Sequence, residues 1–143
     1  MILTATFIGH RDCFDISKDA IKQKIVELIE HGYSVFTNGA MGNFDLLCAK
    51  CVYELKQIYP QIKNIVVIPY LSFKIPFQEY FDEVVYPEGF EKYHFKSAIV
   101  KRNRYLVDNA TASICYVKYS FGGAIETFKY AEKKGIAIIN LAK

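Results

Sequence analysis

Three segments of the chain have the residue pattern of β-strands and are each followed by glycine. Basic side chains lie directly after the first of these glycines. Gly9 directly precedes His10 and Arg11. The other glycines of this pattern are Gly39, Gly42, Gly122 and Gly123. Glycine lets a backbone approach a ligand closely, and the N–H groups at the start of a following helix bind phosphate or carboxylate. Because the guanidinium group of arginine presents a planar fork of donors, the pattern predicts a site for a phosphate-bearing ligand.

Further polar side chains lie close to these glycines in the sequence or are expected to lie close to them in the fold. Asn38 and Asp45 flank the second glycine loop and could contact the hydroxyl groups of a sugar. A helix N-cap is an equally good interpretation of Asp45. Arg102 lies within residues 92–104, a stretch with five cations and no acid. We expect Arg11 and Arg102 to neutralise the phosphate.

Segments typical of strands and of helices alternate along the chain, and they must position these residues. Residues 18–30 carry apolar side chains at helical spacing, with Ser17 as the expected N-cap. Further helices are expected over residues 45–59, 96–109 and 123–134. Strands are expected over residues 4–8, 33–37, 64–69, 83–86, 113–117 and 136–141. The alternation predicts an α/β fold, a Rossmann-like open and mainly parallel sheet with helices on both faces. In such a sheet the glycine loops share the C-terminal edge, where ligands bind.

Length and composition exclude several classes of protein. A chain of 143 residues has the size of one domain, so we expect residues 1–143 to form a single one. Apolar residues make up 52% and charged residues 23%, which excludes a disordered chain. No apolar run approaches the roughly 18 residues that span a bilayer, and residues 1–10 lack the features of a signal peptide. We therefore expect a cytoplasmic protein with no membrane partner.

The cysteine pattern resembles a metal or redox motif only in its spacing. Cys48 and Cys51 lie inside an expected helix, on its apolar side, and no second cysteine pair follows. Because a zinc site needs about four ligands, we expect buried thiols, no metal and no cofactor. Cys13 lies near the expected site and is a candidate reactive thiol.

Five phrases, taken in order, resemble the SLOG superfamily and within it the YpsA-like branch. They are FIGHR at 7–11, NGAMGNFD at 38–45, VIPY at 67–70, KRN at 101–103 and FGGAIET at 121–127. The resemblance implies a Rossmann-like fold, a nucleotide or nucleotide-derived ligand, and a homodimer. The superfamily includes the LOG phosphoribohydrolases, which cleave the base from a nucleoside monophosphate. It also includes the DNA-processing protein A family, which handles single-stranded DNA.

The resemblance assigns ligand binding to a defined set of residues. These are Gly9, His10, Arg11, Gly39, Gly42, Asp45, Arg102, Asn103, Gly122, Gly123 and Thr127. The chain departs from the LOG signature, Gly-Gly-x-Gly-Thr-x-x-Glu, in its second half. Lys129 occupies the position of the catalytic glutamate, and Glu126 lies about one helical turn earlier. An N-glycosidase needs a placed acid or base, so Glu126 is the candidate catalytic residue if the protein is an enzyme.

We expect the protein to bind a phosphate-bearing, nucleotide-like small molecule, as a sensor or ligand-binding protein, at the C-terminal edge of the sheet. Phe44 and Tyr70 could stack on a base. One alternative is a nucleoside-monophosphate phosphoribohydrolase. Another is single-stranded nucleic-acid binding through the cations of residues 92–104 and the many aromatic rings. Because the net charge is only +3, we rank this alternative last and do not expect nucleic acid as a partner.

Overall fold

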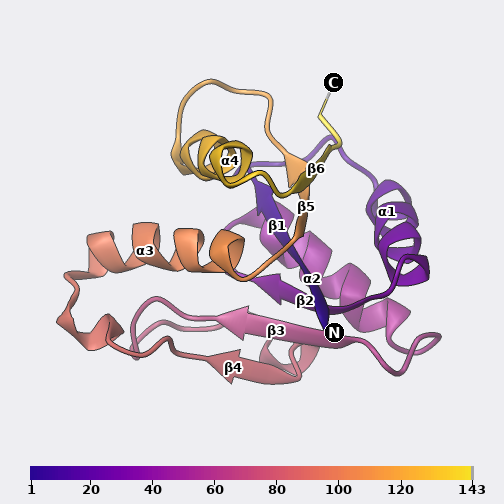
Figure 1. The fold of residues 1–143 in the computed structure, drawn as a ribbon, viewed down its shortest axis with the longest axis horizontal. Helices are drawn as coiled ribbons and strands as arrows, with labels where there is room; N and C mark the ends of the chain where they lie inside the picture. The colour runs from indigo at the N-terminus through magenta and orange to yellow at the C-terminus, as the bar shows by residue number, and fades with distance from the viewer. Residues whose placement is uncertain (143) are drawn as a thin grey trace.

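Six parallel strands form the centre of the computed structural model, which describes residues 1–142 (Figure 1). The strands are β1 (Leu3–Gly9), β2 (Tyr33–Asn38), β3 (Lys63–Val67), β4 (Glu83–Val85), β5 (Ala112–Tyr116) and β6 (Ala137–Asn140). They lie in the order β4-β3-β2-β1-β5-β6, and every neighbouring pair is parallel. The expected open parallel sheet is therefore confirmed.

Helices cover both faces of this sheet. They are α1 (Lys18–Glu30), α2 (Asn43–Leu55), α3 (Phe95–Asp108) and α4 (Gly123–Lys134), with short 3-10 turns η1 (Gln78–Tyr80) and η2 (Phe90–Lys92). α1 and α2 pack together against one face, and α3 and α4 pack together against the other. Right-handed crossovers require this division, since the chain moves outward from β1 to β4 and then returns to β5. No helix in the described part of the chain is long and apolar enough to cross a membrane.

Local signals define the ends of α1. The Ser17 hydroxyl accepts a hydrogen bond from the Ala20 N–H at 3.2 Å, so the expected N-cap is confirmed. Ile21, Ile25 and Leu28 bury the apolar stripe of the helix.

α2 ends at Leu55, earlier than the sequence pattern predicts, and tight turns follow. Pro60 disfavours the helical conformation at Tyr59, so the helix does not resume after these turns.

The largest apolar cluster of the core lies between the sheet and the α1–α2 layer, and a smaller one lies between the sheet and the α3–α4 layer. Cys48 and Cys51 are fully buried within it, and burial raises the pKa of Cys51 to about 11. Both are therefore core thiols, as expected. Burial also raises the pKa of Cys13 to about 11, so this thiol is protonated and enclosed at neutral pH. Over residues 1–142 no three His, Cys, Asp or Glu side chains lie close enough together to hold a metal ion.

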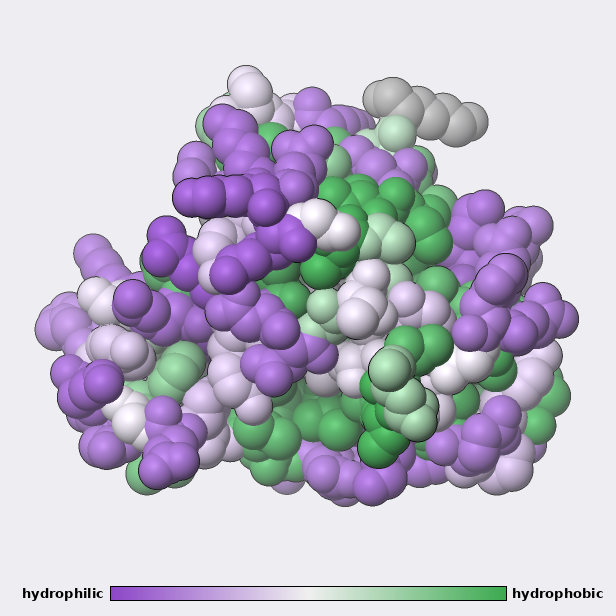
Figure 2. Space-filling model, in the orientation of Figure 1, coloured by the Kyte–Doolittle hydropathy of each residue, from purple (hydrophilic) through white to green (hydrophobic). Residues whose placement is uncertain are grey.

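Hydrophilic residues cover the outward surface of α3 and α4 in the space-filling view, and hydrophobic residues are visible toward the centre of the same face (Figure 2).

Candidate anion-binding cleft

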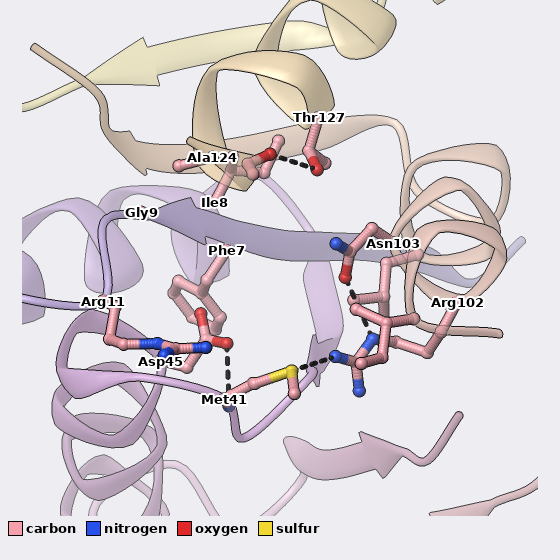
Figure 3. Close-up of a pocket in the computed structure, with 13 residues that line it drawn as sticks. Phe7, Ile8, Gly9, Arg11, Met41, Asp45, Arg102, Asn103, Ala124 and Thr127 are labelled. Carbon is pink, nitrogen blue, oxygen red and sulfur yellow. Dashed lines mark hydrogen bonds between the residues drawn. The ribbon is translucent and has the colours of Figure 1, made fainter. Parts of the chain in front are cut away.

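A cleft of about 180 Å³ lies at the carboxyl end of β1, between the first turn of α2, the middle of α3 and the first turn of α4 (Figure 3). Seven residues predicted from the sequence line it: Gly9, Arg11, Asp45, Arg102, Asn103, Gly123 and Thr127. The chain leaves β1 toward α1 on one face of the sheet and leaves the neighbouring β5 toward α4 on the other. The two loops diverge at this switch point, which is where open α/β sheets bind their ligands.

Arg102 lines the cleft and is only 1% exposed. Its Nη1 donates to the carbonyl oxygens of Gly39 and Val67, both at 2.9 Å, and its Nε donates to Asn103 Oδ1 at 3.0 Å. Among the residues that the structure describes, Nη2 has only the sulfur of Met41 as a partner, at 3.3 Å, and a thioether is a weak acceptor. Within residues 1–142 no carboxylate lies within 4.0 Å of this guanidinium.

Burial lowers the pKa of Arg102, because the charged form loses its hydration. A buried cation needs a charged or strongly hydrogen-bonding partner. Backbone carbonyls supply part of this requirement at Nη1, and the guanidinium also lines the cleft.

Arg11 and Asp45 line the side of the cleft opposite α3. Arg11 is exposed on the loop after β1, and its side chain and that of Arg102 enter the view of Figure 3 from opposite sides. Asp45 is half-buried in the first turn of α2, where Oδ2 accepts from the Met41 N–H at 3.0 Å. Burial raises the pKa of Asp45 to about 6, and the Met41 hydrogen bond and the Arg102 charge only partly offset this rise. The carboxyl can therefore accept from or donate to a hydroxyl near neutral pH.

The first turn of α4 forms a third wall of the cleft. Gly123, Ala124 and Thr127 line it, and Gly122 occupies the N-cap position, where it offers no side chain to the amides of the first turn. N–H groups without a cap and the positive end of the helix dipole suit an anion. Thr127 Oγ1 donates to the Gly123 carbonyl at 3.1 Å. A Cβ on Gly123 would meet no atom within 4 Å, so the cleft is open at this point.

Three of the predicted glycines make room for protein atoms. A Cβ on Gly9 would lie 2.2 Å from the Phe44 ring, and one on Gly39 would lie 2.9 Å from Cζ of Arg102. Gly42 has a φ of 116° and approaches the backbone of Arg11. These close approaches bring β1, the β2–α2 loop and α3 together, and the cleft forms where they meet.

Five predicted site residues do not line the cleft: His10, Asn38, Gly39, Gly42 and Gly122. His10 is 8% exposed, and its Nε2 accepts from the N–H groups of Lys118 and Tyr119 at 2.9 and 3.1 Å. Asn38 is fully buried and bonds to the Ala40 N–H and the Asp45 carbonyl. Both side chains therefore hold loops that border the cleft.

The aromatic residues expected to stack on a base do not line the cleft. Phe44 is fully buried beneath Gly9, so the expectation that its ring contacts a ligand is wrong. Tyr70 packs edge-on against Phe73 and Phe95, outside the cleft.

Glu126, the candidate catalytic residue, is exposed on α4 and does not line the cleft. It borders a neighbouring groove between α3 and α4, together with Lys129, the residue at the position of the LOG glutamate. Six lining residues were not predicted as ligand contacts, and all are apolar: Phe7, Ile8, Met41, Ile99, Leu106 and Ala124. Four of them lie inside the phrases that carry the SLOG resemblance, which is the signal that could have found them, whereas Ile99 and Leu106 have only the pattern of core residues.

Comparisons with known proteins agree with this architecture. The YpsA family model, described as the YspA SLOG family, matches residues 5–137. The SPbeta prophage-derived protein YoqJ of Bacillus subtilis (strain 168) is 30% identical, and the match covers 81% of this chain and 80% of YoqJ.

Two solved structures of DNA processing protein A share the fold. The Streptococcus pneumoniae protein has a TM-score of 0.70 at 18% identity, and the match covers 97% of this chain and 50% of that one. The Helicobacter pylori protein has a TM-score of 0.70 at 19% identity, with 99% and 66% covered. This chain therefore spans about half to two thirds of the length of these proteins.

The Helicobacter pylori structure is described by its single-stranded DNA binding mode. Our expectation that nucleic acid is not a partner is therefore wrong, since a protein with this fold binds single-stranded DNA. The expectation failed because net charge averages over the whole surface, whereas phosphates contact local cations.

The SLOG resemblance, by contrast, is confirmed. Its phrases come together at one edge of a Rossmann-like sheet, and the family model matches nearly the whole length, so the chain belongs to the YspA SLOG family.

Proposed function

We propose that this protein binds a phosphate-bearing, nucleotide-like molecule, with a phosphate group in the cleft. The observation that carries the proposal is the buried guanidinium of Arg102. It lines the same cleft as the uncapped first turn of α4, and no carboxylate of residues 1–142 lies within 4.0 Å of it. An anion between these two groups would accept charge-assisted hydrogen bonds from the Arg102 guanidinium on one side and hydrogen bonds from the α4 N–H groups on the other.

The remaining residues of the cleft suit the other parts of such a molecule. Arg11 is exposed at the side opposite Arg102 and can contact the phosphate from solvent. Asp45 can form a hydrogen bond with a sugar hydroxyl. Its raised pKa favours the protonated carboxyl, which does not repel a nearby phosphate. The single-stranded DNA binding mode of the Helicobacter pylori protein supports a nucleotide unit as the ligand.

The geometry favours binding over the phosphoribohydrolase alternative. Glu126 borders the neighbouring groove and does not line the cleft that contains Arg102. A chromatographic assay for base released from nucleoside monophosphates checks this view, and release that disappears in Glu126→Gln would contradict it.

Calorimetry with nucleoside monophosphates tests the binding function. We expect Arg11→Ala and Gly123→Val each to abolish binding, because the first removes a phosphate contact and the second fills an open wall of the cleft. Both variants should remain folded. Lys24→Ala on α1, on the other face of the sheet, is the control for loss of a positive charge and should bind normally. Unchanged affinity in both cleft variants would refute the proposal.

A further inference from the structure

A second hollow adjoins the cleft. It is a groove of about 570 Å³ between α3 and α4, and it shares four lining residues with the cleft: Ile99, Asn103, Gly123 and Thr127. A ligand that leaves the cleft over these shared residues enters the groove directly.

The cleft alone is small for the ligand that its polar groups suit. Small-molecule sites occupy about 300–1,000 Å³, whereas the cleft measures about 180 Å³. The groove, at about 570 Å³, is the larger space. A phosphate and part of a sugar can occupy the cleft, and the rest of the ligand must lie elsewhere.

The charge of the groove matches an anion. Arg104, Lys129 and Lys133 border it together with a single acid, Glu126. Over residues 1–142, none of the three cations has a carboxylate within 4.0 Å.

Arg104 is held in place without using a carboxylate. Its guanidinium lies over the Tyr130 ring, 5.3 Å from the centroid, and the Tyr130 hydroxyl donates to Asp108 Oδ1 at 2.7 Å. A cation–π contact leaves the N–H donors in the guanidinium plane available. The anchored ring therefore presents a cation to the groove that can bind phosphate.

We propose that the groove binds the second nucleotide of the ligand, so that the natural ligand is a linear dinucleotide joined by a phosphodiester. The first phosphate lies in the cleft beside Arg102, and the second lies beside Arg104 and Lys133. This inference rests on the proposed function, because the cleft must hold the first phosphate.

Calorimetry with three probes in one buffer tests the inference: thymidine monophosphate, the dinucleotide pTpT and a twelve-residue oligothymidylate. We expect pTpT to bind roughly tenfold more tightly than the monophosphate, as charge-assisted hydrogen bonds to a second phosphate predict. The oligothymidylate should bind about as tightly as pTpT, because the two hollows hold two units.

The double variant Arg104→Gln/Lys133→Gln should lose the gain for pTpT and keep the affinity for the monophosphate. Lys24→Gln/Lys22→Gln on α1 is the control for total charge and should keep the gain.

The experiment distinguishes failure of the second site from failure of the proposed function. If the monophosphate binds and pTpT binds no more tightly, or if the double variant keeps the gain, the second site is refuted and the proposed function stands. An oligothymidylate that binds more than about tenfold more tightly than pTpT would replace the dinucleotide with a longer strand. Absence of binding by every probe would refute both proposals.

Discussion

The guanidinium of Arg102 lies directly against the backbone of Gly39, although the two residues are 63 positions apart. Nη1 donates to the Gly39 carbonyl at 2.9 Å, and a Cβ on residue 39 would lie 2.9 Å from Cζ. This contact joins α3 to the end of β2 and fixes the depth at which the cation lies in the cleft.

Substitution Gly39→Ala should therefore destabilise the protein and weaken phosphate binding. The new methyl group displaces the guanidinium and breaks hydrogen bonds to buried carbonyls, at a cost of about 1–3 kcal/mol. Urea unfolding measures the loss of stability. Gly123→Ala is the matched control, because its Cβ meets nothing within 4 Å. Equal stability of the two variants would show that Arg102 moves aside without cost.

Substitution Gly9→Ala should also be destabilising, for a different reason. Its Cβ would lie 2.2 Å from the buried Phe44 ring, and overpacking of this kind costs about 1–3 kcal/mol. A double-mutant cycle with Phe44→Ala provides the check. Gly9→Ala should cost less in this background, because the two nearest atoms of Phe44, Cδ2 and Cγ, are absent. Additive free energies of unfolding would argue against the contact.

Asp45 should make stability depend on pH in mildly acidic solution. Its folded pKa of about 6 lies above the ordinary value of 3.8, so the folded state holds the proton more tightly than the unfolded state. The free energy of unfolding should therefore fall as pH rises from about 4 to about 6, by at most about 3 kcal/mol.

Urea unfolding from pH 4 to pH 7 compares the wild type with Asp45→Asn, which retains an oxygen for the Met41 N–H. The variant lacks this contribution, and groups common to both proteins cancel in the difference. Parallel profiles would contradict the raised pKa of Asp45.

His10 should act in the opposite direction. Its Nε2 accepts two backbone N–H groups, which requires the neutral ring, and burial followed by the Lys118 charge lowers its pKa from 6.5. Stability from this residue is present above about pH 6.5 and is lost as pH falls through the lower folded value. NMR titration of the His10 ring measures that value directly. A midpoint at or above 6.5 would mean that the two hydrogen bonds do not form in solution.

Signals close together in the sequence were sufficient for most of the secondary structure. The helical spacing of residues 18–30, with Ser17 before and Gly32 after, predicts α1 with its observed ends. α4 over 123–134 agrees equally well. Both succeed because caps, apolar periodicity and glycine act within one or two helical turns. The alternation of elements then limits the topology, since parallel crossovers are right-handed.

The sequence by itself determined the class of fold, the edge of the sheet that carries the glycine loops and the family resemblance. Only the tertiary structure decided what each of these residues contacts. It buries Phe44 under Gly9, turns His10 and Asn38 into loop anchors, and places Asp45 rather than Glu126 in the cleft. The physical reason is that exposure and pKa depend on groups far apart in the chain. Whether Arg102 is solvated or buried depends on which residues pack around it, and in the fold it is buried. Residue type and spacing in the sequence do not predict that packing.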